Sequence, residues 1–213
     1  MTQSLADLRR DYSLAALTEQ SVAPDPFKQF GRWWHEAVSA QLPEPNAMTL
    51  ATVAPDGAPA ARIVLLKSFD DQGFVFYTNY QSATGRQLAA NPRAALVFLW
   101  KELERQVRIE GTVSQTSRAQ AEAYFNTRPR ASRIGALASQ QSAPVANREI
   151  LDARFRELDA RHPDDAIPMP EYWGGYCVAP ALFEFWQGRS GRLHDRLCYR
   201  RAAGRWLIER LQP

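Results

Sequence analysis

The sequence has few of the residues that build metal sites or disulfide frameworks. It contains only two cysteines and three histidines in 213 residues, and their spacing does not match a zinc site. The two cysteines, Cys177 and Cys198, are too few for a disulfide-stabilised scaffold. We therefore expect no metal, reduced thiols and a cytoplasmic protein.

Long apolar runs are missing as well. No stretch approaches the ~18 apolar residues of a membrane span, and the charged segment 1–12 is unlike a secretory signal. Lys and Arg number 26 against 23 Asp and Glu, and this net charge of +3 suits an anionic ligand without demanding nucleic acid. We therefore expect neither a membrane nor a nucleic-acid partner. Glycine-rich dinucleotide fingerprints and Gly-x-Ser-x-Gly nucleophile elbows are also absent.

The remaining composition is that of a globular protein. Hydrophobic residues make up 45% and charged residues 23% of the chain, which is long enough to bury a sizeable core. No shift in composition marks a linker between domains. We expect a partly mobile polar arm over residues 1–24 and a single domain over residues 25–213.

Local patterns predict strands on both sides of a helical middle. Asp25-Pro26 reads as an N-cap followed by a first-turn proline, so a helix is expected to begin there. Strands are predicted at 48–54, 60–66, 74–78, 94–100, 106–114, 173–178, 182–187, 197–201 and 206–211, and further helices at 82–90, 117–126, 134–139 and 147–161. Because the two groups of strands must pair in one sheet system, we expect a mainly β, α+β barrel or sandwich.

Two clusters of cations stand where strands and helix ends are usually apolar or neutral. In the strand segment 62–67, alternation places Arg62, Val64 and Leu66 on one face. A buried cation there is costly unless it meets an anion. The second cluster offers guanidinium and hydroxyl donors suited to a phosphate, and consists of Tyr124, Arg128, Arg130, Ser132 and Arg133. Taken alone, each cluster also fits an ordinary solvated strand end or helix end.

A third cluster joins two aromatic-rich segments near the C-terminus. Phe183-Glu184-Phe185-Trp186-Gln187 is followed, after four residues, by Arg192-Leu193-His194-Asp195-Arg196. If this second segment is extended, Arg192, His194 and Arg196 share one face, and Leu193 packs on the other. A lone histidine is more often structural than catalytic, but one that shares a face with two arginines is a better functional candidate.

The stretch 183–196 resembles the C-terminal motif of the pyridoxine (pyridoxamine) 5′-phosphate oxidases. That motif reads Glu-aromatic-Trp, a spacer, and then Arg-Leu-His-Asp-Arg. The resemblance extends from Leu8 to Pro213 in the family's order of motifs. The other matching segments are 62–67, 76–79, 103–107, 128–130, 141–142 and 173–175.

This resemblance implies an FMN-binding split β-barrel that acts as a homodimer with FMN at the subunit interface. The implied reaction oxidises pyridoxine 5′-phosphate or pyridoxamine 5′-phosphate to pyridoxal 5′-phosphate. O2 is the electron acceptor, H2O2 is a product, and the amine substrate also yields ammonia. Because the flavin carries the redox chemistry, the absence of a nucleophile or metal motif is consistent with this function.

Matched residue by residue, the resemblance also implies a site. Arg192 and His194 would be catalytic and would flank the pyridine ring. FMN would be held by Arg62, Ile63, Val64, Leu65, Leu66, Lys67, Tyr77, Thr78, Gln106, Gln141, Ser142, Trp186 and Arg196. The substrate would be held by Arg9, Tyr12, Lys67, Tyr124, Arg128, Ser132, Arg192 and His194. Arg9 and Tyr12 belong to the arm 1–24, which the resemblance implies closes over the substrate.

The chain departs from the family pattern at one place. After Ser82 the family usually has Arg-Lys directed at the FMN phosphate, whereas this chain has Ala83 and Thr84. Arg86 lies close by, and the helix N-terminus still offers N–H groups to an anion. Two alternatives therefore stay open. One is a related split-barrel flavin oxidase with another substrate, such as the oxidases of phenazine biosynthesis, and the other is a non-catalytic pyridoxal phosphate carrier.

Overall fold

One antiparallel sheet of nine strands organises the computed structural model, which describes residues 4–8 and 10–213. The strand order is β2-β1-β5-β6-β7-β4-β3, and β8 pairs with both β7 and β9. The strands are β1 Ala47–Val53, β2 Pro59–Leu65, β3 Ser68–Asp70, β4 Gly73–Asn79, β5 Arg93–Trp100, β6 Arg105–Gln115, β7 Trp173–Gln187, β8 Asp195–Ala202 and β9 Arg205–Arg210. The expected single sheet system of an α+β protein is confirmed.

Strand β7 connects the two halves of the sheet. The sequence predicted two strands here, but β7 runs unbroken for 15 residues. One edge pairs with β6, while the other pairs first with β4 and then with β8. Pro180, which cannot donate a ladder hydrogen bond, lies between the two predicted segments. It lies where the β6 register shifts between Glu110 and Gly111, and an irregularity of this kind accommodates a proline.

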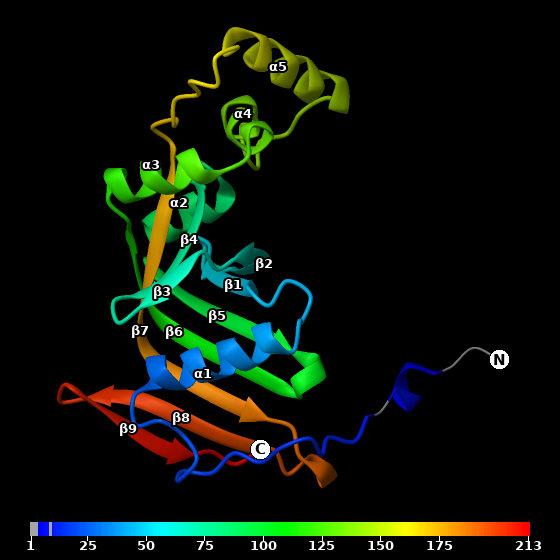
Figure 1. Cartoon of the computed structure of the whole chain (residues 1–213), viewed down its shortest axis with the longest axis vertical. Helices are drawn as coiled ribbons and strands as arrows, with labels where there is room; N and C mark the ends of the chain where they lie inside the picture. Colours follow the sequence, from blue (N-terminus) through cyan, green and yellow to red (C-terminus); the bar gives the residue numbers. More distant parts are fainter. Residues whose placement is uncertain (1–3, 9) are drawn as a thin grey trace.

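Helices cover the inner face and one end of the sheet. Helix α1, Pro26–Ser39, begins as predicted, with the Asp25 side chain accepting the Lys28 N–H. Its Phe30 and Trp33 are buried in the main core. The other helices are α2 Ala83–Ala90, α3 Arg118–Thr127, α4 Arg130–Ala138 and α5 Arg148–Arg161, with short 3-10 turns η1 Leu5–Asp7, η2 Lys101–Leu103 and η3 Ser190–Arg192. Figure 1 shows α4 and α5 at the end of the molecule opposite β8 and β9.

Two apolar cores result from this arrangement. The main core lies between α1 and the sheet, and a smaller one packs α3 and α4 against the start of β7. Leu17 and Val22 belong to the main core although they precede α1, and Ala23 O accepts a hydrogen bond from the Tyr199 hydroxyl at 2.7 Å. The later part of the arm is therefore packed. Within the described residues, no helix is long and apolar enough to cross a membrane.

The segment before β8 differs from the extended strand that the sequence suggested. Gly191 and Arg192 have positive φ angles of 64° and 63° in η3, and β8 begins only at Asp195. This turn breaks the strand alternation, so Arg192 and His194 do not continue the face of Arg196. The expectation that Leu193 packs in the core is wrong, because its side chain is 73% exposed in this chain.

Candidate functional site

Three aromatic rings stack where β7 begins. The Tyr77 ring centroid lies 4.1 Å from that of Tyr124 and 5.4 Å from that of Trp173, with planes 18° and 8° apart. Gly175 makes room for this stack, because a Cβ there would lie 2.8 Å from Tyr77 Cε1. Lys67 Nζ lies 5.9 Å from the Tyr124 ring centroid. The fold thus brings together residues from β4, α3, β7 and the loop after β2.

Arg128 completes this group and has an unused hydrogen-bond donor. Its guanidinium carbon lies 4.8 Å from the Trp173 ring centroid. Its Nη1 is buried and has no hydrogen-bond partner among the described residues. Burial lowers the pKa of Arg128, yet arginine keeps its charge at neutral pH. An unpaired buried donor is costly, so an anion is the ligand that this position fits. We call the group the stack cluster: Lys67, Tyr77, Tyr124, Arg128 and Trp173.

Arg62 is a second cation that lacks an anionic partner. It donates to Leu50 O at 3.2 Å, Thr52 Oγ1 at 2.5 Å and Gln87 Oε1 at 2.8 Å. All three are neutral oxygens, and burial lowers the pKa of Arg62. In the described part of the chain its charge is not balanced by an ion pair, so the site beside α2 favours an anionic group.

The rest of the segment 62–67 follows the predicted alternation. Val64 packs on the core and Leu66 is buried, whereas Ile63 and Lys67 are exposed. Leu65 is half-buried at the end of β2. Only part of this segment is therefore free to contact a ligand through its side chains.

The loop after α4 returns to the end of β4. Gln141 Oε1 accepts hydrogen bonds from the Asn79 N–H at 3.3 Å and from the Thr78 hydroxyl at 3.4 Å. Ser142 follows with a positive φ of 70°. Ser132 lies half-buried on α4. The fold thus brings Thr78 and Gln141 together, as the sequence interpretation required.

A second group forms at the far end of β7. Gln106 pairs with Trp186, which in turn pairs with Arg196, so the three side chains are cross-strand neighbours on one face. Glu184 orients Arg196, since its Oε1 accepts from Arg196 Nε and its Oε2 from Arg108 Nη2, both at 2.7 Å. Burial alone would raise the pKa of Glu184, but the hydrogen bonds from the two arginines outweigh it and lower that pKa.

The Trp186 ring also contacts His194 and the N-terminal arm. Its centroid lies 4.6 Å from that of His194 and 5.8 Å from that of Tyr12. His194 Nδ1 accepts the Arg189 N–H at 3.1 Å, so a neutral ring carries its proton on Nε2. Arg192 is exposed nearby on η3, whereas Arg9 lies outside the described residues. We call this group the arm-side cluster: Tyr12, Gln106, Trp186, His194 and Arg196.

The two clusters lie at opposite ends of β7. Trp173 is its first residue and Trp186 its last but one. At ~3.3 Å per residue they are about 40 Å apart along the strand. In Figure 1, β7 begins beside α3, and its arrowhead lies between α1 and β8. A single chain therefore cannot place both clusters around one small ligand.

Comparison with known proteins identifies the family of the chain. The model of the family described as pyridoxamine 5′-phosphate oxidase matches residues 34–162, and the model of the pyridoxine 5′-phosphate oxidase C-terminal dimerisation region matches residues 173–213. The chain belongs to this family. The two clusters draw on both matched regions of the oxidase, and only Tyr12 lies outside them.

Individual relatives agree with the family models. A pyridoxine/pyridoxamine 5′-phosphate oxidase of Thermosynechococcus vestitus is 60% identical over 209 residues, which cover 98% of this chain and 99% of that protein. The protein of the same name from Acaryochloris marina is 57% identical over 210 residues, covering 99% and 96%. Both similarities span nearly the whole oxidase chain.

Solved structures support the fold. PhzG from Burkholderia lata 383, in complex with tetrahydrophenazine-1-carboxylic acid, superimposes with a TM-score of 0.88 at 32% identity, covering 94% of this chain and all of that one. A pyridoxamine 5′-phosphate oxidase-related, FMN-binding protein from Nostoc punctiforme gives a TM-score of 0.74 at 19% identity, covering 90% and 100%. The expected split-barrel fold is confirmed.

Sequence reasoning assigned no role to several residues that the structure places at the site. Trp173 lay within a matching segment, but only the stack with Tyr77 shows what it contacts. Glu184 carried a signal, because a carboxylate between two buried phenylalanines needs cationic partners. Glu104 and Asp195 also lay within matching segments, but nothing in the sequence indicated that they accept hydrogen bonds from main-chain groups of the distant arm.

Proposed function

We propose that this chain is an FMN-dependent oxidase that converts pyridoxine 5′-phosphate and pyridoxamine 5′-phosphate to pyridoxal 5′-phosphate. O2 accepts the electrons and H2O2 is released, together with ammonia when the amine is the substrate. The buried Nη1 of Arg128, beside Lys67 and Tyr124, has no hydrogen-bond partner in the described part of the chain, and this observation carries the proposal. A phosphate monoester supplies the acceptor oxygens that this donor lacks. A cytoplasmic location belongs to the same proposal.

The residues present fit FMN by the chemistry of their donors. Arg62 offers a positive charge whose hydrogen bonds, within the residues that the structure describes, go to neutral oxygens. Gln106, Trp186 and Arg196 offer an amide, an apolar ring and a guanidinium on one face of the sheet. Bound FMN supplies the acceptor for the hydride that leaves the substrate. Ser142 and the segment 62–67 are further proposed FMN contacts, as are Tyr77, Thr78 and Gln141.

The chain's own residues bind and orient the substrate. Lys67, Tyr124 and Arg128 hold the phosphate, with Ser132 as a further donor. Arg192 and His194 flank the pyridine ring, and His194 directs its Nε2 proton at a ring substituent because Nδ1 is occupied by the Arg189 N–H. Tyr12 and Arg9 close the arm over the site and exclude water. Correct placement of the reacting carbon accounts for most of what the protein must contribute.

Each site takes the stack cluster of one chain and the arm-side cluster of its partner. The separation of the clusters along β7 supports this arrangement, and so does the match to a dimerisation region. Leu99 and Ile63 are 65% and 66% exposed. Leu99 pairs directly with Gln106, beside the Trp186 and Arg196 row. Apolar surface of this kind is what a homodimer interface buries.

The proposed function is tested by oxygen uptake of the purified protein. We expect a flavin absorbance band, and O2 consumption with H2O2 release on addition of either vitamer phosphate, increased by added FMN if the cofactor is partly lost. A flavin-containing protein that oxidises neither vitamer phosphate would favour the alternative of another split-barrel oxidase. A protein that binds pyridoxal phosphate but no flavin would favour the carrier.

Ala83→Arg is expected to tighten FMN binding about ten- to hundredfold, because one charge-assisted hydrogen bond contributes that much to affinity. Ala83 is the half-buried first residue of α2, where the family's cation is missing. Thr84 is buried, so a lysine there would have to extend along the surface to reach solvent. Ala83→Arg alone should therefore give most of the gain, measured by fluorescence titration of the apoprotein with FMN.

The control adds the same charge at the other end of α2. Ala89 is exposed, so Ala89→Arg should leave the FMN dissociation constant unchanged. Arg86 already directs Nη1 to Gln81 O at the start of the helix. An unchanged dissociation constant in Ala83→Arg would mean that Arg86, or another group, already satisfies the phosphate.

A further inference from the structure

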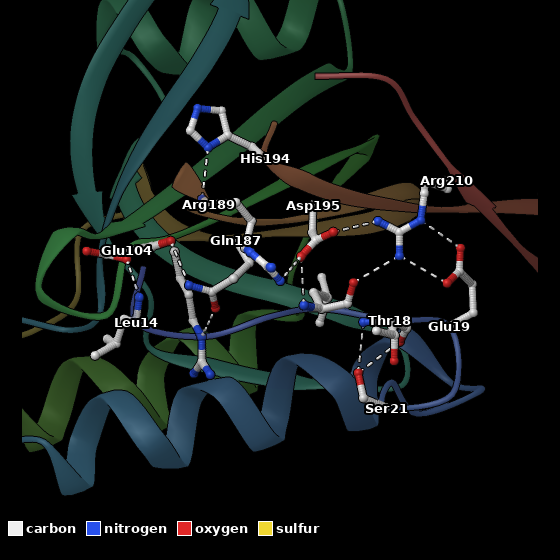
Figure 2. A network of polar contacts seen from close by, with 12 residues as sticks. Leu14, Thr18, Glu19, Ser21, Glu104, Gln187, Arg189, His194, Asp195 and Arg210 are labelled. Carbon is white, nitrogen blue, oxygen red and sulfur yellow. Dashed lines mark hydrogen bonds and ion pairs between the residues drawn. The ribbon is translucent and has the colours of Figure 1, made fainter. Parts of the chain in front are cut away.

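The N-terminal arm is held at the C-terminal end of β7 by its main chain. The Leu14 N–H donates to Glu104 Oε2 at 2.9 Å, and the Leu17 N–H donates to Asp195 Oδ2 at 3.0 Å. Figure 2 shows both carboxylates reaching the arm from elements that lie far away in the sequence. Because the bonds involve backbone groups, they fix the path of the arm whatever side chains it carries there.

Asp195 is the centre of the larger half of this network. Its Oδ1 accepts from Arg210 Nη1 at 2.7 Å, and its Oδ2 accepts from Arg189 Nη1 at 3.2 Å. Arg210 also donates to Leu17 O at 2.9 Å and to both carboxylate oxygens of Glu19 (Figure 2). Burial would raise the pKa of Asp195, but the hydrogen bonds from Leu17 and Arg210 outweigh it and lower that pKa. The carboxylate is therefore ionised at neutral pH.

Glu104 is a rigid anchor. It is 9% exposed and adopts a left-handed conformation with φ 54° after η2. Its carbonyl oxygen accepts the Gly188 N–H at 2.7 Å and Gln187 Nε2 at 3.2 Å. The residue whose carboxylate accepts the Leu14 N–H is thus hydrogen-bonded to the end of β7, next to Trp186.

Tyr12 lies two residues before Leu14, whose N–H group Glu104 holds. A Cβ added at Gly188 would lie 2.8 Å from both Cβ and Cγ of Tyr12, and 3.0 Å from the Glu104 Cβ. Only a residue without a side chain leaves room for Tyr12 in this position. From there its ring contacts Trp186 and His194, at centroid distances of 5.8 and 5.9 Å.

We propose that Glu104 and Asp195 are positioning residues for substrate binding. They act through the arm: their carboxylates hold the Leu14 and Leu17 N–H groups, and this places Tyr12 over Trp186 and His194. Neither carboxylate needs to touch the substrate. The Leu14 side chain is 59% exposed, so the hydrogen bond rather than apolar packing fixes this part of the arm. The contact between the carboxylates and the arm does not depend on the proposed function, but its effect on substrate binding rests on that function.

Glu104→Ala tests the contact directly in the full-length holoprotein. Hydrogen–deuterium exchange of the peptide containing Leu14, followed by mass spectrometry, should become about ten- to hundredfold faster, the value of one hydrogen bond to a charged group. The KM for pyridoxine 5′-phosphate should rise about tenfold by the same principle, with a smaller change in kcat. Unchanged exchange in Glu104→Ala would overturn the proposal, whatever the activity.

Two matched variants separate positioning from a general loss of structure. Glu104→Gln keeps an acceptor oxygen for the Leu14 N–H and should recover most of the protection and the KM. Glu102→Ala removes an exposed neighbouring carboxylate that pairs with Lys101, and should change neither. Equal effects of Glu104→Gln and Glu104→Ala would overturn the proposal, because the acceptor oxygen would then be irrelevant.

Gly188→Ala tests the position of Tyr12 in a chain that keeps both carboxylates. The added methyl group should displace Tyr12, raise the KM and speed exchange at residues 10–14, while thermal unfolding stays close to that of the unmodified protein. An unchanged KM after faster exchange would overturn the positioning role. If the unmodified protein oxidised neither vitamer phosphate, the proposed function and this role would both fail, yet the exchange rates would still report whether Glu104 holds the arm.

Discussion

Pyridoxine 5′-phosphate is expected to be oxidised with a kcat/KM about four orders of magnitude higher than that of pyridoxine. In the stack cluster, a buried Arg128 donor has no partner among residues 4–8 and 10–213, and Lys67 lies close to the Tyr124 ring. An unphosphorylated vitamer leaves these groups unpaired in a partly desolvated site, which is the situation in which a polar site discriminates most strongly. Initial rates of oxygen uptake over a range of concentrations of both compounds measure the ratio. Comparable efficiencies would refute the phosphate assignment.

The same assignment can be tested from the protein side. Arg128→Ala should lower kcat/KM for pyridoxine 5′-phosphate about ten- to hundredfold and leave that for pyridoxine nearly unchanged. Arg156→Ala, which removes an exposed arginine on α5, is the control and should affect neither substrate. An equal loss with both substrates would show that Arg128 supports the fold rather than the phosphate.

Arg192→Ala is expected to slow the reductive half-reaction about hundredfold while leaving the fold and the flavin band intact. Arg192 lies on η3 with an exposed side chain, and the residues proposed to hold FMN lie elsewhere. Its guanidinium is proposed to orient the pyridine ring for hydride transfer. Anaerobic single-turnover reduction of the bound flavin by pyridoxine 5′-phosphate reports this step without the later reaction with O2.

Two further variants, Arg192→Lys and His194→Ala, show whether the charge of Arg192 or its geometry is needed. Arg192→Lys keeps the charge but loses the planar, five-donor geometry, so it should recover little of the rate. His194→Ala should have a milder effect, since it removes one orienting hydrogen bond and not a charge. If Arg192→Ala reduced its flavin at the normal rate under saturating substrate, Arg192 would serve binding alone. If it lost the flavin or unfolded, the segment would be structural.

Local patterns in the sequence predicted most of the regular elements. The N-cap at Asp25 and the alternation through β2 are properties of neighbouring residues, and both are confirmed. Two departures arose from irregular backbone. The two strands predicted at 173–178 and 182–187 are one strand with a register shift at Pro180, and the positive φ angles of Gly191 and Arg192 end the extended pattern that the sequence suggested.

The site was predictable only where it resembles a known motif. Gln106, Trp186 and Arg196 could be matched one by one, but their alignment across three strands depends on sheet register. The roles of Glu104 and Asp195 depend on hydrogen bonds to backbone groups 90 and 178 residues away. A main-chain N–H is present at almost every residue, so nothing in the sequence distinguishes Leu14 and Leu17 as partners.

The length of β7 has a consequence for genetics. In a dimer with shared sites, a chain lacking Arg128 and a chain lacking Arg196 form one site with both lesions and one site with neither. Two inactive alleles with lesions at opposite ends of this strand would therefore complement each other in one cell, whereas two alleles with lesions at the same end would not. The pattern of complementation among alleles would then show whether a mutation affects the stack cluster or the arm-side cluster.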